Sequence, residues 1–254
     1  MAQGYSGFLW QEALKREIER KDRIFSPEDD IVFQEMLEEI NASGYDIHYL
    51  ATFDFYNIPN IGEIVKKYIF RFQSENIRSA LIEQLVFSRV PDCGEILLEL
   101  YLHYRQSTCK TPTNAGIIVR YDNAFNRCKP KRIKNELLEL LSVPINAYYL
   151  PFTLKMLSSW KIPECKEILL RYLHPENISA SDLEIAEDTE DLLARLQYRQ
   201  KQLRCSAILN LRYYPTDEII SILENITHET DRDFCRAAEK SLQYIKSRHR
   251  TGDG

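Results

Sequence analysis

The sequence contains side chains that carry out chemistry in many proteins, but their spacing matches no known catalytic or metal-binding pattern. No two cysteines have the C-x-x-C spacing of a zinc site, and the H-E-x-x-H, G-x-S-x-G, Walker and dinucleotide fingerprints are missing. The histidines and cysteines are scattered singly: His48, His103, His174, His228, His249, Cys93, Cys109, Cys128, Cys165, Cys205 and Cys235. We therefore predict no metal, no cofactor and no catalytic residue, and expect a protein that is not an enzyme.

A short basic segment is the strongest charge feature of the chain. Residues 105–134 carry a local charge of +7, because eight basic residues face one acid, Asp122, in a chain whose net charge is −5. The basic residues are Arg105, Lys110, Arg120, Arg127, Lys129, Lys131, Arg132 and Lys134. Such an asymmetry favours an acidic protein partner or nucleic acid phosphate, and a solvated loop between helices is the alternative. Tyr121 and Phe125 in this segment could stack on bases or pack in the core.

The composition is that of a soluble globular protein. Of 254 residues, 44% are apolar and 28% are charged, and no run of 18 apolar residues exists that could span a membrane. The first residues lack the pattern of a signal peptide, so we expect a cytoplasmic protein with reduced, mostly buried thiols. Only eight glycines and no hairpin signals between alternating strands indicate a protein that is nearly all helix.

One sequence pattern occurs twice: "SRVPDCGEILLELYLH" from Ser88 and "SWKIPECKEILLRYLH" from Ser159. Related steps of an apolar residue followed by proline occur at Ile58-Pro59, Val90-Pro91, Ile162-Pro163 and Tyr214-Pro215, with a degenerate copy at Pro130. Proline suits the first position of a helix, because its missing N–H would be unpaired there. A period of roughly 32–39 residues with two helices per unit predicts an α-solenoid.

The last of these units resembles the HEAT-repeat family. "ILENITHETDRDFCRAAEKSLQYI" is similar to a HEAT unit with a V-R-x-A-A-x-x-A-L second helix, which Cys235-Arg236-Ala237-Ala238 and Ser241-Leu242 match. Ile77-Arg78 and Leu203-Arg204 occupy the V-R positions of two other repeats. The resemblance covers about residues 45–247 and is weakest around 107–150. It implies an all-α, right-handed α-solenoid of about five to six two-helix repeats. It also implies structural arginines that pair with turn acids, such as Arg236 with Asp231. An irregular helical bundle is the alternative.

We predict an N-terminal helical cap at 1–44 and one continuous repeat domain at 45–254. Ser26-Pro27-Glu28-Asp29 is a helix start, Gly44 a helix end, and acids from Glu28 to Glu39, Asp29 included, would give the cap its polar face. Within the repeats we expect a degenerate basic repeat near 107–150. Near 175–191 we expect an acidic insertion that forms an exposed loop before the helix "DLLARLQYRQKQL".

The second helices of such repeats line the concave binding face. We expect them near 45–56, 77–88, 113–126, 148–160, 201–213 and 234–247. Their outward stripes include Asn76, Ser79 and Ser206, and Trp160 either covers the core between repeats or anchors a partner at the groove edge. The predicted partner-binding residues are Glu83, Arg120, Arg127, Lys129, Lys131, Arg132, Lys155, Trp160 and Asn210.

Two functions compete at this point. The first is a cytoplasmic adaptor or an inhibitor of the immunity type that binds a protein. The second is a nucleic-acid-binding protein resembling the DNA glycosylases built from HEAT-like repeats, with Asp122 beside Tyr121 in a catalytic role; the acidic flanks of the basic segment argue against it. A small-molecule enzyme, by analogy with the HEAT-like phycobilin lyases, has only fold-level support.

Overall fold

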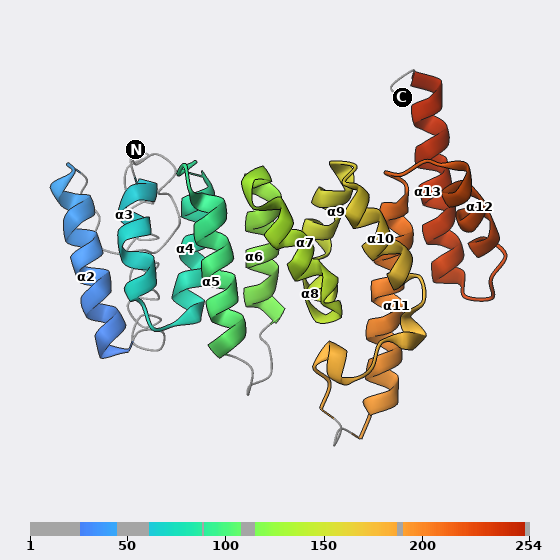
Figure 1. Ribbon diagram of the computed structural model, residues 1–254. Coiled ribbons are helices and arrows are strands. Elements are labelled where there is room, and N and C mark those ends of the chain that lie inside the picture. Colours follow the sequence, from blue (N-terminus) through green and yellow to red (C-terminus); the bar gives the residue numbers. More distant parts are fainter. Residues whose placement is uncertain (1–25, 45–60, 88, 108–114, 187–189, 252–254) are drawn as a thin grey trace, which may run out of the picture. The chain divides into compact units, whose positions relative to one another are not determined.

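The protein is built from helices (Figure 1). The computed structural model describes residues 26–44, 61–87, 89–107, 115–186 and 190–251, and every regular element in these ranges is helical, which confirms the all-α prediction. The predicted helix start at Ile58-Pro59, the predicted helix at 45–56 and residues 1–25 of the cap lie outside the described residues. No helix in the described ranges is long and apolar enough to cross a membrane.

The chain divides into two compact units, residues 1–128 and 129–254. The N-terminal unit contains α2 (Pro27–Ala42), α3 (Ile61–Tyr68), η2 (Ile69–Arg71), α4 (Glu75–Phe87), α5 (Cys93–Ser107) and α6 (Ala115–Cys128). The C-terminal unit contains η3 (Lys131–Ile133), α7 (Lys134–Ser142), α8 (Pro144–Tyr149), α9 (Pro151–Ser159), α10 (Pro163–Tyr172), η4 (Pro175–Asn177), η5 (Ser181–Leu183), α11 (Leu192–Leu211), α12 (Asp217–Ile226) and α13 (Arg232–Thr251). The boundary between the units falls inside the predicted degenerate repeat and divides the basic segment.

Helix α2 begins and ends as its sequence predicts. Ser26 is the N-cap, and its hydroxyl accepts a hydrogen bond of 3.1 Å from the backbone N–H of Asp29. Pro27 occupies the first turn, where its missing N–H costs nothing. Gly44 follows the helix with a φ of 95°, a left-handed conformation that glycine adopts without a steric penalty.

In the N-terminal unit, helices that are next or next but one in sequence pack on each other. Helix α4 contacts α3, α5 and α6, and α2 contacts α3. Aromatic rings fill the centre: Tyr121 forms an edge contact with Tyr101 at a centroid distance of 5.5 Å and stacks on Tyr104 at 5.9 Å. Tyr121 and Phe125 are fully buried, so these two rings of the basic segment pack in the core.

In the C-terminal unit, alternate helices also contact each other. Helix α9 contacts α11 and α11 contacts α13, and α7 also contacts α10, which follows it after α8 and α9 (Figure 1). Hydrogen bonds between these contacting helices join side-chain hydroxyls to backbone carbonyls. The hydroxyl of Tyr172 donates to Leu141 O at 2.8 Å, and that of Ser241 donates to Ile208 O at 3.0 Å. Helices of similar orientation therefore form layers within this unit.

A helix begins within a few residues of each described proline step, but only Pro163 occupies the predicted first position of its helix. Helix α10 begins at Pro163, whereas α12 begins at Asp217, because Thr216 rather than Pro215 provides the N-cap and accepts a hydrogen bond of 3.3 Å from Ile219 N–H. The predicted helix at 148–160 is wrong in its first part. The chain forms α8 and then α9, and Pro151 starts the second helix, because a proline inside a helix breaks its hydrogen bonding.

The prediction that the acidic insertion is an exposed loop is wrong for its apolar residues. Ile178, Leu183 and Ile185 are buried, and the insertion contains η4 and η5. Two side chains of α11 hold it: Arg199 donates to the carbonyl of Leu183, and Gln200 donates to that of Ile178 at 2.7 Å. Helix α11 starts at Leu192, as the predicted helix "DLLARLQYRQKQL" does within one residue, and it continues through most of the predicted second helix at 201–213 to Leu211.

Turns that follow three of the second helices share a backbone conformation that is unfavourable for most residues. Arg89, Lys129 and Lys161 have φ values of 51°, 46° and 56°, and each lies just before a proline. After α9, the N–H of Lys161 donates to Ser158 O at 2.8 Å, which satisfies one of the last free carbonyls of the helix. A basic residue therefore stands at three positions where glycine is favoured.

Candidate functional site

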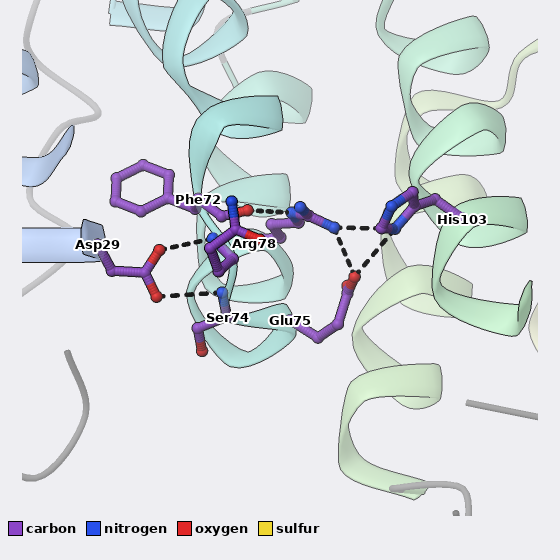
Figure 2. Close-up of polar contacts among 7 residues, drawn as sticks. Asp29, Phe72, Ser74, Glu75, Arg78 and His103 are labelled. Atoms are coloured by element: carbon purple, nitrogen blue, oxygen red, sulfur yellow. Dashed lines mark hydrogen bonds and ion pairs between the residues drawn. The ribbon is translucent and has the colours of Figure 1, made fainter. Parts of the chain in front are cut away.

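Asp29 holds the start of α4 (Figure 2). Its carboxylate accepts hydrogen bonds from the backbone N–H groups of Gln73 at 2.5 Å and Ser74 at 3.1 Å, directly before the helix begins at Glu75. The side chain is only 1% exposed, so the prediction that Asp29 contributes to a polar outer face is wrong. A buried carboxylate requires such partners, and the N-terminal N–H groups of a helix provide them.

Arg78 and Glu75 form a buried ion pair, and the half-exposed side chain of His103 lies next to it (Figure 2). The Arg78 guanidinium donates to the carbonyl of Phe72 at 2.7 Å and to Glu75 Oε1 at 2.7 Å, and it lies 2.9 Å from His103 Nδ1. His103 Nδ1 is also 3.3 Å from Glu75 Oε1. Arg78 bonds a backbone carbonyl and a carboxylate of its own turn, which confirms its predicted structural role.

Tyr121 of α6 lies beside this network. Its hydroxyl and Glu75 Oε2 are buried, and neither has a hydrogen-bond partner. Burial raises the pKa of Tyr121 far above its usual value, and the Glu75 carboxylate raises it further. The phenol therefore stays protonated at neutral pH. A phenol this buried and this weakly acidic is a poor proton shuttle. We therefore interpret the network as a structural part of the core of the N-terminal unit.

The ion pairs at the turn before α13 differ from the predicted one. Asp231 forms an ion pair of 2.9 Å with Lys201, whereas Arg236 is exposed, so the predicted Asp231–Arg236 pair is wrong. Arg204 pairs with Glu229 at 2.6 Å and lies over the Phe234 ring at 4.3 Å. Lys201 reaches the turn before α13 from the neighbouring helix α11, whereas Arg236 lies in α13 itself and is exposed.

The described cysteines are free thiols, but fewer of them are buried than predicted. Cys165 is buried, and Cys93, Cys128, Cys205 and Cys235 are partly exposed. Burial raises the pKa values of Cys165 and Cys205. These two side chains are therefore neutral thiols at pH 7 and weak nucleophiles.

Basic and aromatic side chains gather at one edge of the C-terminal unit. The Lys131 ammonium lies 5.9 Å from the ring centroid of Trp160, which caps the C-terminus of α9 and is half-buried. Lys161 follows Trp160, and Lys129 precedes η3; both are exposed and both have a positive φ. The structure thus brings Lys129, Lys131 and Trp160, all predicted to bind a partner, to one place.

The same edge continues to α11 and α13. The hydroxyl of Tyr214 donates to Ile162 O at 2.7 Å, which joins the turn after α11 to the turn after α9. Arg212, the C-cap of α11, lies over the rings of Tyr213 at 5.1 Å and Tyr244 at 4.9 Å. The two rings are in edge contact at 5.6 Å, and Arg248 lies 5.1 Å from the Tyr244 ring. We define the cation–aromatic edge as Lys129, Lys131, Trp160, Lys161, Arg212, Tyr213 and Tyr244.

The cations of this edge are not neutralised locally. Within the described ranges no carboxylate pairs with Lys129, Lys131, Lys161 or Arg212. Arg212 is half-buried; one of its nitrogens contacts Tyr213 Oη at 3.3 Å, and its buried Nε has no partner. A partly desolvated guanidinium without a counter-ion is an unfavourable state that an anionic ligand would relieve.

The other predicted binding residues lie elsewhere. Arg132 is exposed in η3, Lys155 is exposed on α9, and Arg127 is exposed on α6 of the N-terminal unit. Arg120, also on α6, donates to Ser79 Oγ at 2.9 Å. The Glu83 side chain lies outside the described residues.

Two residues of the predicted outward stripes are buried instead. Asn210 is 4% exposed and its amide donates to the Ser206 carbonyl at 2.8 Å, so it is not available to a partner. Ser79 is fully buried, because α6 packs over that side of α4. Spacing along a helix gives the direction of a side chain, but the stripe becomes a surface only if no later helix covers it.

Sequence reasoning missed Lys161, Arg212, Tyr213 and Tyr244. Lys161 could have been found from the sequence, because it stands before a proline step in the same way as Arg89 does. The Arg212–Tyr244 contact had no such signal, because Arg212 caps α11 and Tyr244 lies within α13, and the two helices meet only in the folded unit.

No cluster of three or more His, Cys, Asp and Glu side chains that could hold a metal ion occurs in the part of the chain that the structure describes. Compared with known proteins, the sequence matches no family model, and no curated protein or solved structure is detectably similar to it. The function is therefore argued from the geometry of the cation–aromatic edge.

Proposed function

We propose that this protein is a non-enzymatic protein-binding module, an adaptor or an inhibitor of the immunity type, acting in the cytoplasm. Its binding surface is the cation–aromatic edge of the C-terminal unit. The observation that carries the proposal is the Lys131–Trp160 contact, flanked by Lys129 and Lys161 at positive φ. Tryptophan, tyrosine and arginine are the residues that most often dominate the energy of protein interfaces, and this edge contains all three.

The backbone at Lys129 and Lys161 supports a role beyond stability. A left-handed conformation costs a non-glycine residue about 1–2 kcal/mol. Glycine would remove that cost, so a lysine at each position is not the most stable choice. Residues held in such conformations persist because the surrounding structure fixes them, and they cluster at functional sites.

The packing of the C-terminal unit supports a HEAT-like α-solenoid as the architecture. Alternate helices contact each other as the layers of stacked two-helix repeats do, and the hydrogen bond from Tyr214 to Ile162 joins equivalent turns of neighbouring repeats. The shared positive φ before successive prolines is a second feature that a repeating unit explains. Stacked repeats hold their turns in a row, which is the shape an extended partner can follow.

Nucleic acid binding is the second candidate, since clustered lysines and arginines suit phosphate. Two observations count against it. The Tyr121 ring and the Asp122 carboxylate, which that hypothesis used for base stacking and catalysis, are 0% and 1% exposed. Exposed acids, Glu164 and Asp217, also stand in the first turns of α10 and α12, next to the turns that carry the cations.

The proposal is tested by capture of partners from native lysate, with a parallel nuclease-treated sample. The full-length protein is compared with Trp160→Ala and with the double variant Lys129→Glu, Lys131→Glu. Lys155→Glu is the matched control, because it reverses an exposed charge on α9 outside the edge. One protein that survives nuclease, binds the control variant and is lost with both edge variants supports the proposal. Partners that disappear with nuclease, or that bind all variants equally, contradict it.

A further inference from the structure

We propose that Cys93 and Cys128 form a reversible disulfide when the protein meets a small-molecule disulfide, and that this bond joins the start of α5 to the end of α6. The inference goes beyond the proposed function, because both cysteines lie in the N-terminal unit and outside the cation–aromatic edge. It assigns a modification site to two thiols that are 35 positions apart in the sequence.

Helices α5 and α6 pack on each other in opposite directions (Figure 1). The Tyr101 ring of α5 contacts the Phe125 ring of α6 at a centroid distance of 6.4 Å. Tyr104, one turn later on α5, contacts Tyr121, one turn earlier on α6, at 5.9 Å. Such an antiparallel pair places the first residue of one helix near the last residue of the other.

The two cysteines occupy those two ends. Cys93 is the first residue of α5, and Cys128 is the last residue of α6. Both lie on the packed face of their helix, since Cys93, Leu97 and Tyr101 follow each other at intervals of four, and Cys128 follows Phe125 by three. The thiols of Cys93 and Cys128 accordingly share a hydrogen bond. Cys128 Sγ also donates to the Phe125 carbonyl at 3.7 Å, which keeps it at the end of α6.

Both thiols are within reach of a small oxidant, because Cys93 and Cys128 are partly exposed. Cys165, which stands in the place of Cys93 in the second copy of the repeated pattern, is buried, and its sulfur lies 3.4 Å from Ser158 Oγ. The neighbouring thiol and the exposure are therefore properties of Cys93 and not of the repeat. In a reducing compartment such pairs are usually transient and respond to the redox state.

The surroundings give the two thiols different roles. The hydrogen bond with Cys93 raises the pKa of the Cys128 thiol far above its usual value, and burial, the charge of Cys93 and that of Glu95 raise it further. Cys128 therefore keeps its proton while Cys93 supplies the thiolate. The N-terminus of α5 favours a negative charge at Cys93, and the adjacent Asp92 carboxylate is paired with Lys66 at 3.3 Å.

The reaction proceeds in two exchange steps with oxidised glutathione as the oxidant. The Cys93 thiolate attacks one sulfur of glutathione disulfide, whose S–S bond breaks and releases one glutathione thiolate. Cys128 then loses its proton to solvent, and its sulfur attacks that of Cys93 and releases the second glutathione thiolate. Two protein thiols thus lose two electrons and two protons, and one glutathione disulfide becomes two glutathione thiols.

Peptide mapping of the full-length protein tests the inference. The folded protein is equilibrated with reduced and oxidised glutathione in a series of ratios, the remaining thiols are alkylated, and the chain is digested with trypsin without reduction. Trypsin cuts after Arg105 and Arg127, so Cys93 and Cys128 fall in different peptides that only a disulfide joins. The same oxidation is repeated in urea, where the packing of α5 on α6 is lost.

Single substitutions separate the two roles. Cys128→Ser should stop at the mixed disulfide between Cys93 and glutathione. Cys93→Ser should form its mixed disulfide at Cys128 about tenfold more slowly, because less of that thiol is ionised. Cys205→Ser is the matched control, since it removes a partly exposed thiol of α11, and it should give the joined peptide as the parent does. Equal reactivity of the first two variants contradicts the assignment of Cys93 as the attacking thiol.

We expect the joined peptide to increase with the share of oxidised glutathione and to disappear after dithiothreitol is added, with an unchanged circular dichroism spectrum. In urea the bonds should spread over several cysteine pairs. A Cys93 that stays reduced in fully oxidised glutathione, bonds to other cysteines in the folded protein, or the same pattern in urea overturns the inference. Partner capture by the edge variants is a separate measurement, so failure here leaves the proposed function as it stands.

Discussion

The hydroxyl of Tyr214 donates a hydrogen bond of 2.7 Å to the backbone carbonyl of Ile162, 52 residues earlier in the sequence. Both residues are buried, at 8% and 5% exposure. Ile162 is the N-cap of α10, and Tyr214 precedes the N-cap of α12, so the bond joins two turns at the same place in successive helix pairs. This bond holds the two halves of the cation–aromatic edge together.

Replacing Tyr214 with phenylalanine is expected to destabilise the protein by about 0.5–1.5 kcal/mol, because the buried Ile162 carbonyl loses one of its two hydrogen bonds and keeps only the one from the N–H of Cys165. Urea denaturation followed by circular dichroism measures the free energy of unfolding. Tyr213→Phe is the matched control, since its hydroxyl contacts only the neighbouring, half-buried Arg212. A Tyr214→Phe variant as stable as the control would show that the hydrogen bond does not stabilise the contact between the two turns.

Replacing Asp29 with alanine is expected to destabilise the N-terminal unit by about 1–3 kcal/mol, because the backbone N–H groups of Gln73 and Ser74 lose their acceptor in a buried place. The loss appears in thermal or urea denaturation. Glu28→Ala removes an exposed acid from the same first turn of α2 and controls for the helix dipole. Equal effects of the two substitutions would mean that Asp29 acts through its charge on α2 and not as a cap for α4.

Replacing Lys161 with glycine is expected to stabilise the fold while weakening partner binding. Relief of the left-handed conformation raises the free energy of unfolding by about 1–2 kcal/mol. The greater freedom of glycine in the unfolded chain lowers it again by about 0.5–1 kcal/mol. Denaturation and partner capture on the same preparation measure both quantities. Lys155→Gly, in the interior of α9, should instead lose about 1 kcal/mol. A stabilised variant with unchanged binding would make Lys161 irrelevant to the edge.

Stability of the C-terminal unit is expected to fall as the pH drops through the acid range. The hydrogen bond from Lys201 lowers the pKa of Asp231 below its ordinary value. A carboxyl whose pKa is lower in the folded state contributes stability above its unfolded pKa, about 4, and loses it as the pH falls through the lower folded value. Asp231→Asn should flatten the dependence of the unfolding free energy on pH below about 5. The Glu224→Gln variant, on exposed α12, should keep the slope of the parent; an unchanged slope in Asp231→Asn would contradict the ion pair's role.

Much of the local structure could be predicted because it depends on neighbours in sequence. The Ser26 cap, Pro27, and Gly44 at a φ of 95° are determined by steric and hydrogen-bonding preferences that act over a single turn. The start of α10 at Pro163 has the same origin. The all-helical class followed from apolar periodicity and the shortage of strand signals, which also act locally.

The candidate site could be predicted only in part. Lys129, Lys131 and Trp160 stand out through their residue types, but the basic segment that contained two of them is divided between two units. Asn210 and Ser79 have the helical spacing of surface residues, yet neighbouring helices cover both. Whether a polar side chain faces water depends on which helix packs next to it, and a single helix does not contain that information.

By itself, the sequence determined the helices, their caps and the repeated proline turns, since these depend on interactions within a few residues. Only the tertiary structure decided that Arg212 meets Tyr244, that Lys131 meets Trp160, and that Asp29 serves a helix far from its own. Such contacts depend on how helices stack, and stacking is set by the summed burial of many apolar side chains, to which each polar residue contributes little. The edge that we propose as the binding surface is a product of that stacking.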